Sequence, residues 1–167
     1  MIIAIFGLSG SGKSVFAKKV ADLTGFPIVE ASQEFLKQHN STRKDAHKLP
    51  IVRNVLEGCC VPTSAIVVGI RTIDELDHLR KISQVLGVKI QTSDEERVAR
   101  VRSRDGITEE EFQKSDEFEA KLFELFPHEL TKRDVQRIVV QTTCGDTKEL
   151  TQILTWVKEQ RVKNGTA

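Results

Sequence analysis

The hydrophobic and polar positions of the chain fall into two alternating kinds of segment. Short runs rich in apolar and β-branched residues are typical of buried strands, and five of them occur, at 2–6, 27–30, 65–68, 85–90 and 137–140. Helical spacing and capping signals predict helices over 13–23, 32–38, 49–56, 72–82 and 147–160, with two more that begin near Ser93 and Thr108. Because strands and helices alternate along the whole chain, we expect a three-layer α/β fold with a mostly parallel five-stranded sheet and helices on both faces.

Two polar segments interrupt this alternation. Residues 39–48 are polar and basic without periodicity, which is typical of a loop, and residues 105–134 are highly charged and contain no strand pattern. The sequence shows neither an internal repeat nor a linker. We therefore expect one domain over 1–167, with an insertion at 32–62 and a helical region at 105–134.

Composition excludes several classes of function. The 167 residues are 39% hydrophobic and 29% charged, which is the balance of a globular protein. Lys and Arg number 25 against 24 Asp and Glu, so no basic field favours nucleic acid, and the first apolar run is too short to span a membrane. The three cysteines lack metal-binding spacing, and we expect a reduced, cytoplasmic protein. An anionic ligand must then be held by local groups.

A glycine-rich loop directly follows the first predicted strand. The stretch FGLSGSGKS at 6–14 matches G-x-x-x-x-G-K-[ST] at every fixed position, and a predicted helix follows it. In this P-loop context backbone N–H groups surround a triphosphate, Lys13 reaches its β- and γ-phosphates, and the Ser14 hydroxyl is placed to ligate Mg²⁺. We therefore expect a P-loop NTPase that uses ATP and Mg²⁺. The expected nucleotide-binding residues are Gly7, Ser9, Gly10, Ser11, Gly12, Lys13, Ser14 and Val15.

Other nucleotide-binding classes are excluded by what the chain lacks. A dinucleotide-binding G-x-G-x-x-G would need a third glycine where Val15 stands. A GTPase would carry N-K-x-D after a strand, whereas the nearest match, at 131–134, lacks the asparagine and precedes a strand. Large motor ATPases need a longer chain, so a compact phosphotransferase is favoured.

The third predicted strand leads to Gly69-Ile70-Arg71-Thr72 at the carboxyl edge of the sheet, where ligands bind in α/β folds. Arg71 would lie there opposite the glycine loop, although an exposed arginine at a helix start is an equally ordinary interpretation. Together with the glycine loop, this stretch resembles the nucleoside monophosphate kinase-like family, which includes adenylate kinases, archaeal dephospho-CoA kinase-like proteins and phage deoxynucleoside monophosphate kinases. The resemblance implies that Arg71, Ser32 and Glu75 bind the acceptor phosphate beside the insertion at 32–62.

Arginines gather in the helix predicted after Ser93. At 100° per residue Arg97, Arg100 and Arg104 share one face, and a solvated helix face is the ordinary explanation of such a charge run. In the family that the chain resembles, this helix leads into a lid, here 105–134, whose arginines close over the donor phosphates. The catalytic residues that the resemblance implies are Lys13, Arg71, Arg100 and Arg104.

Two positions depart from the family pattern. Family members carry an acidic residue at the end of the third strand, where this chain has Val68, and hard cations such as Mg²⁺ require oxygen ligands. Glu30, after the second predicted strand, is a candidate replacement as base or metal anchor, with helix capping as its alternative role. Phe112 and Asp116 match a further family element, F-x-x-R-D-x-x-E, in which Ser115 replaces the arginine.

Three functions remain open on the sequence alone. The first is a kinase that transfers the γ-phosphoryl of ATP–Mg²⁺ to a nucleoside monophosphate or a similar small phosphorylated acceptor. The second is a nucleotide-binding protein of the same fold with weak or lost kinase activity, acting as a sensor or partner subunit. The third is a small-molecule kinase for a non-nucleotide hydroxyl. The expected partner is thus a small nucleotide, and the sequence indicates no oligomeric state.

Overall fold

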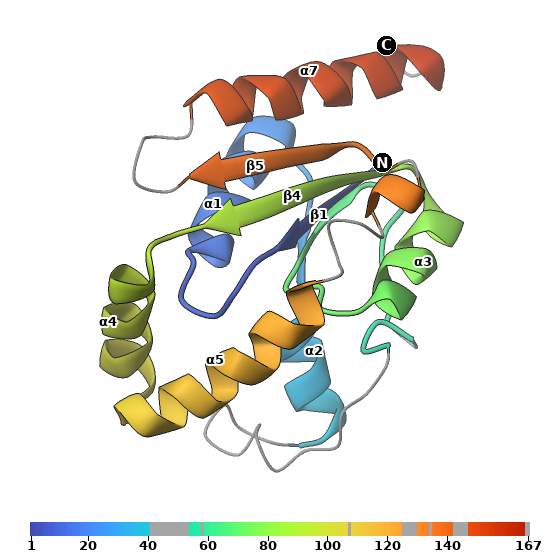
Figure 1. Ribbon diagram of the computed structural model, residues 1–167. Helices are drawn as coiled ribbons and strands as arrows, with labels where there is room; N and C mark the ends of the chain where they lie inside the picture. The colour runs from blue at the N-terminus through green and yellow to red at the C-terminus, as the bar shows by residue number, and fades with distance from the viewer. Residues whose placement is uncertain are drawn as a thin grey trace.

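A computed structural model describes residues 1–40, 54–57, 59–106, 108–124, 130–133, 135–141 and 147–165. Its centre is a five-stranded sheet in the order β2-β3-β1-β4-β5, in which every neighbouring pair is parallel (Figure 1). The strands are β1 (Ile2–Phe6), β2 (Ile28–Glu30), β3 (Ala65–Val68), β4 (Val85–Gln91) and β5 (Arg137–Gln141). The helices are α1 (Lys13–Thr24), α2 (Ala31–Gln38), α3 (Ile73–Ile82), α4 (Asp94–Asp105), α5 (Glu109–Glu124) and α7 (Thr147–Lys163). The predicted α/β fold with a parallel five-stranded sheet is confirmed.

Most predicted elements occur within a residue or two of their predicted ends, because their boundaries carry local signals. The hydroxyl of Thr72 caps α3 in a complete capping box with Glu75, and the hydroxyl of Ser93 accepts a hydrogen bond from the backbone N–H of Glu96. Thr108 and Glu111 likewise exchange hydrogen bonds at the start of α5. The predicted loop at 39–48 and helix at 49–56 lie mostly outside the described residues, and residues 55–57 form a turn.

The sheet separates two apolar layers, as the period of two along a strand requires. On one face Ile3 and Ile5 of β1 pack with the buried sides of α1 and α7, including Trp156. On the other face Ile2 and Ala4 pack with Leu76 and Leu79 of α3. All of β1 is buried, so its continuous apolar run belongs to a central strand that is covered on both sides.

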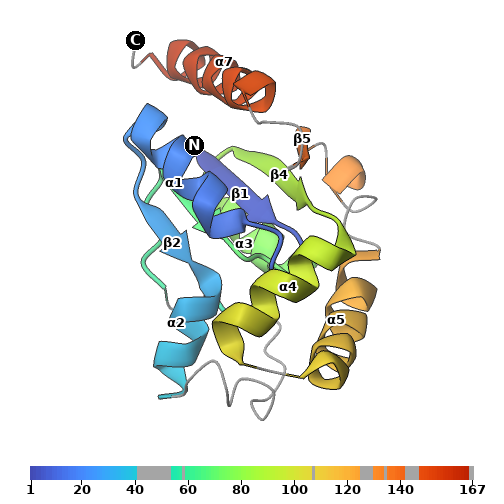
Figure 2. The same cartoon turned by 90° about the vertical axis from the view of Figure 1, so that its left-hand side faces the viewer.

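The parallel register brings the ends of the strands to one edge. Val68 is in register with Glu30 on one side and Ile5 on the other, and the N–H of Gly69 donates to the carbonyl of Ile5 at 2.9 Å. In Figure 1 the arrowheads of β1, β4 and β5 point toward α4, and Figure 2 shows α4 lying across this edge. The loops after β1, β2, β3 and β4 therefore meet at one place. None of the helices in the described part of the chain is long and apolar enough to cross a bilayer.

Candidate nucleotide and acceptor site

The glycine-rich loop leaves β1 in a conformation that side chains would obstruct. Gly7 and Gly10 have φ angles of 145° and 78°, which favour glycine. A Cβ atom on Gly7 would lie only 2.5 Å from the carbonyl oxygen of Ile90 in β4. The loop is thus held against the end of the neighbouring strand, at the edge where α/β proteins bind ligands.

The start of α1 lacks the side-chain cap that α3, α4 and α5 have. Gly12 occupies the N-cap position without a side chain, and the first turn contains no acidic residue. Side-chain hydroxyls of Thr72, Ser93 and Thr108 serve α3, α4 and α5 instead. The positive end of α1 is therefore left for an external anion, which is the property of a phosphate-binding loop.

Three polar side chains of the loop fit a bound triphosphate and metal. The Nζ atom of Lys13 donates to the carbonyl oxygens of Gly7 at 2.7 Å and Leu8 at 2.8 Å, which holds an ammonium group at the mouth of the loop. The hydroxyl of Ser11 is buried and has no partner among the described residues. Ser14 is exposed at the start of α1. The loop therefore fits a triphosphate such as that of ATP, and the binding of Mg²⁺ by Ser14 stays a prediction.

Protein ligands for a metal are otherwise scarce at this edge. Within the described ranges, no three His, Cys, Asp or Glu side chains gather into a group that would hold an ion. Val68 is 2% exposed and belongs to the apolar cluster that also contains Phe16 and Val88. A Mg²⁺ ion here would rely on Ser14, water and substrate oxygens, as Mg²⁺ commonly does.

Glycine at position 10 is predicted to be required by the contact of the loop with α4. An added Cβ would lie 2.8 Å from both the carbonyl oxygen of Arg97 and the Cγ2 atom of Val101. Gly106 has a similar φ of 64° but nothing within 4 Å, so Gly106→Ala is a control for backbone strain alone. We expect Gly10→Ala to lower the free energy of unfolding by about 2 kcal/mol more than Gly106→Ala, measured by chemical denaturation. Equal losses of unfolding free energy in the two variants would show that α4 shifts to accommodate the added methyl group.

Arg71 follows β3 at the same edge, on a backbone that Glu75 holds in place. The carboxylate of Glu75, 2% exposed, accepts hydrogen bonds from the N–H groups of Arg71 at 2.7 Å, Thr72 at 3.1 Å and Val55 at 3.4 Å. Burial raises the pKa of the Glu75 carboxyl, and these N–H groups oppose that rise. Glu75 thus fixes the backbone at Arg71 and Thr72, and its role in binding an acceptor stays a prediction.

The side chains of Arg71, Glu30 and Ser32 are partly exposed. The guanidinium of Arg71 makes no hydrogen bond or ion pair with any residue that the structure describes, although it attracts the buried charge of Glu75. Across the described ranges the side chains of Glu30 and Ser32 have no such partner either. Glu30 stands at the N-cap position of α2 but does not cap it, which removes the alternative role that the sequence left open. Arg71, Glu30 and Ser32 lie at or just past the ends of the neighbouring strands β2 and β3, where ligands bind in α/β folds.

Glu30 lies next to the position of the missing carboxylate. It is in register with Val68 on the neighbouring strand, and residues in register share a face of the sheet. Ile28, two residues earlier, packs against the same apolar cluster as Val68, which agrees with this orientation. Glu30 therefore offers oxygen atoms one strand away from Val68.

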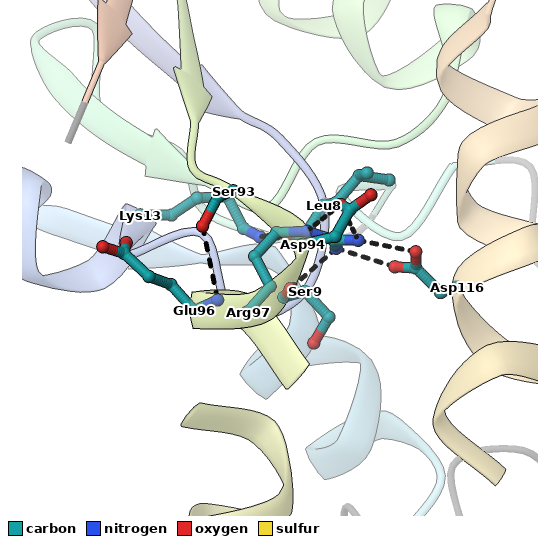
Figure 3. A network of polar contacts seen from close by, with 8 residues as sticks. All are labelled: Leu8, Ser9, Lys13, Ser93, Asp94, Glu96, Arg97 and Asp116. Carbon is teal, nitrogen blue, oxygen red and sulfur yellow. Dashed lines mark hydrogen bonds and ion pairs between the residues drawn. The ribbon is translucent and has the colours of Figure 1, made fainter. Parts of the chain in front are cut away.

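The arginines of α4 have different surroundings, although they lie on one side of the helix. Arg97 is 2% exposed, and all five of its N–H groups have acceptors: the carbonyl of Ser9 at 3.0 Å, Asp116 at 2.7 and 2.6 Å, and Asp94 at 3.1 and 3.3 Å (Figure 3). Its guanidinium also lies 5.6 Å from the ring centre of Phe112. Burial would lower the pKa of Arg97, but the charges and hydrogen bonds of Asp116 and Asp94 raise it above its usual value.

Arg97 is therefore fully engaged inside the protein and is not a free cation on the solvated face that its spacing suggested. Arg100 lies nearer to the expected role, because it donates to the carbonyl of Gly10 at 3.3 Å and to Glu96 at 3.0 Å while staying exposed. Arg104 is exposed at the end of α4 and pairs with Asp105 at 2.5 Å. The contacts of Arg100 and Arg104 with donor phosphates stay predictions.

No protein-family model and no curated protein matches the sequence. Solved structures of similar fold include a sugar kinase from Janibacter sp., 20% identical, covering 94% of each chain with a TM-score of 0.63. Shikimate kinase from Acinetobacter baumannii, in complex with shikimate, is 20% identical over 96% of this chain and 94% of that chain, also at 0.63. A gluconokinase from Sinorhizobium meliloti 1021 is 17% identical over 95% of each chain at 0.59. The chain thus has the fold of small-molecule kinases that contain a P-loop.

Proposed function

We propose that the protein is an ATP-dependent phosphotransferase that moves the γ-phosphoryl group of ATP–Mg²⁺ to a nucleoside monophosphate or a similar small phosphorylated acceptor in the cytoplasm. One observation carries the proposal: an uncapped phosphate loop and a guanidinium without a partner among the described residues, Arg71, lie at the same edge of one sheet. Phosphoryl transfer needs two anionic substrates brought end to end, and cations that neutralise the charge between them.

Each side of the site has a defined task in this proposal. The loop amides and Lys13 bind the donor phosphates, and Ser14 would hold Mg²⁺, which supplies charge neutralisation when bound. Arg71 grips the phosphate of the acceptor through a planar fork of donors. Arg100 is proposed to stabilise charge on the transferring group from the α4 side, with Arg104 entering as the helical region at 105–134 closes. The sheet edge would thus be lined with cations on both sides of the reacting group.

A coupled assay of ADP release tests the function directly. The panel should contain nucleoside and deoxynucleoside monophosphates, and also phosphate-free sugars and hydroxy acids, each with ATP–Mg²⁺. We expect acceptor-dependent release with a nucleoside monophosphate, and none with the Lys13→Ala protein. Release that occurs only with a phosphate-free acceptor would overturn the proposed substrate class but not phosphoryl transfer.

The similar structures favour a second candidate. They are a sugar kinase, a gluconokinase and a shikimate kinase, and neither gluconate nor shikimate carries a phosphate group. A hydroxyl acceptor would still need an anchor, and a carboxylate would suit Arg71 as well as a phosphate does. The phosphate-free arm of the panel decides between the two acceptor classes.

A nucleotide-binding protein with little or no kinase activity is the remaining alternative, and buried Val68 is the observation that supports it. Tight ATP binding without turnover on any acceptor would favour this reading. Glu30 distinguishes an active kinase from a protein that only binds nucleotide, because its carboxylate is in register with Val68 and is the candidate replacement for the missing acidic residue.

Glu30→Gln is predicted to lower kcat by about 100-fold while ATP affinity changes little, because it removes a base or metal anchor but keeps the size of the side chain. Glu34→Gln is the matched control, since Glu34 on α2 pairs with Lys37 at 2.7 Å at the surface. A titration of Mg²⁺ separates the two roles. Loss of metal anchoring raises the Mg²⁺ concentration that activity requires, and loss of a base does not. Unchanged kcat would remove Glu30 from the chemistry.

A further inference from the structure

We propose that Arg97 and Asp116 are positioning residues that hold the Ser9–Gly10 limb of the phosphate loop in its binding conformation and thereby make α5 part of the nucleotide site. The inference deepens the proposed function and rests on it for the identity of the ligand. Figure 3 shows the contacts that carry it: Arg97 donates to the carbonyl of Ser9 and to both carboxylate oxygens of Asp116.

The carbonyl oxygens of the phosphate loop accept hydrogen bonds from several parts of the chain. When successive backbone N–H groups turn inward around an anion, the carbonyl oxygens of the same peptides point outward and need donors of their own. Each carbonyl from Gly7 to Gly12 has one. The donors, in the order of the chain, are Lys13 for Gly7, Lys13 and the N–H of Ser11 for Leu8, Arg97 for Ser9, Arg100 for Gly10, Thr92 for Ser11 and the N–H of Phe16 for Gly12.

Arg97 differs from the other side-chain donors in being buried. Lys13 is partly exposed and would leave the carbonyls of Gly7 and Leu8 when it turns to phosphate, and Arg100 is exposed. Arg97 is 2% exposed and also supplies the backbone against which Gly10 packs, with its carbonyl oxygen 2.8 Å from the Cβ position of that glycine. The Ser9–Gly10 limb is thus fixed by α4 from one residue, both through a hydrogen bond and by contact.

Asp116 is what allows a charged guanidinium to stay there. A buried cation without a partner is strongly unfavourable. The carboxylate of Asp116, on α5, accepts two hydrogen bonds from the guanidinium of Arg97 and neutralises its charge. Asp94 also pairs with Arg97, but its side chain is 83% exposed and belongs to the same helix, so it holds the charge less firmly and does not tie α4 to α5. The position of α5 therefore sets the position of the guanidinium, and the guanidinium sets that of the Ser9 carbonyl.

The test separates folding from positioning with an apolar double variant. Asp116→Leu leaves the buried guanidinium of Arg97 without its α5 partner and is expected to lower Tm by roughly 10 °C. Arg97→Met leaves the partly buried carboxylate of Asp116 unpaired and is expected to lower Tm by a smaller amount. The double variant Arg97→Met/Asp116→Leu removes both charges together and should regain most of that Tm. It still lacks a donor for the Ser9 carbonyl. Arg97→Lys is the conservative variant, whose single ammonium cannot serve Ser9 and both oxygens of Asp116 at once.

Two readouts report on the loop. In the ligand-free double variant, the ¹⁵N order parameters of Gly10 and Ser11 should fall from about 0.85 to below about 0.6. The Kd of the double variant for ATP–Mg²⁺ should rise about tenfold, because the loop is no longer preorganised. The Kd of the Arg97→Lys protein should lie between those of the wild type and the double variant. The control is Arg102→Met/Glu109→Leu, which removes an exposed ion pair of 3.6 Å that also joins α4 to α5 but does not touch the loop. It should change neither readout.

Wild-type order parameters in the stable double variant would overturn the proposal, and so would wild-type ATP affinity in that variant. If the wild-type protein binds no purine triphosphate, the proposed function fails. The order parameters of Gly10 and Ser11 still decide whether Arg97 positions the loop, because they are measured without any ligand.

Discussion

Lys13→Ala is expected to abolish measurable ATP binding while the protein stays folded. The Nζ atom lies at the mouth of the loop, bonded to the carbonyls of Gly7 and Leu8, and the side chain is not part of either apolar cluster. A charged donor to two phosphates contributes about 3 kcal/mol or more, so affinity should fall by at least about 100-fold. Isothermal titration calorimetry with ATP, with and without Mg²⁺, measures this loss.

Lys18→Ala is the matched control for that experiment. Lys18 is exposed and lies on the same helix, five residues after Lys13. At 100° per residue it therefore lies on a different face of α1 from Lys13. Its removal should leave ATP affinity and Tm unchanged. Wild-type affinity in the Lys13→Ala protein would mean that the loop does not bind a triphosphate, and the proposed function would fail with it.

Arg71→Ala should act on the other substrate. We expect the KM for the acceptor to rise and kcat to fall, with kcat/KM lower by about 100-fold, while the Kd for ATP stays within about twofold. The backbone N–H of Arg71, and not its side chain, is what Glu75 binds, so the substitution leaves the local fold intact. Steady-state kinetics with varied acceptor, combined with calorimetry for ATP, check both parts.

Arg71→Lys is the graded variant for this site, and Lys81→Ala is the control for loss of a surface charge on α3. Lysine keeps the charge but lacks the planar fork, so Arg71→Lys should lie between wild type and alanine. Equal weakening of donor and acceptor would place Arg71 outside the acceptor site. The phosphate-free acceptors add a further check, because only those with a carboxylate should depend on Arg71.

The local parts of the nucleotide site could be predicted from the sequence because a strand, a glycine pattern and a helix start are all encoded by neighbouring residues. Gly7 and Gly10 have the positive φ angles that the loop requires, and Lys13 begins α1. Thr72 shows the same after β3, where a threonine at the start of a helical pattern predicts an N-cap that the structure contains.

The role of Arg97 could not be predicted in this way. Arg97 and Asp116 are 19 residues apart on separate helices, and nothing in the spacing of the arginines distinguishes a buried one from an exposed one. The match of Asp116 to a family element was a signal that this carboxylate matters, but it did not name its partner. Likewise Glu75 accepts a hydrogen bond from the N–H of Val55, 20 residues away in the turn at 55–57, and the sequence around Glu75 does not indicate this partner.

The sequence by itself determined the alternation of strands and helices, the helix caps and the phosphate loop, because each depends on the period or spacing of residues that are close along the chain. Only the tertiary structure decided which charges are buried and with which partners, because burial and pairing depend on how α4, α5 and the loop pack at the end of the sheet. Register decided the rest: it placed Glu30 beside Val68 and put the phosphate loop and Arg71 at one edge.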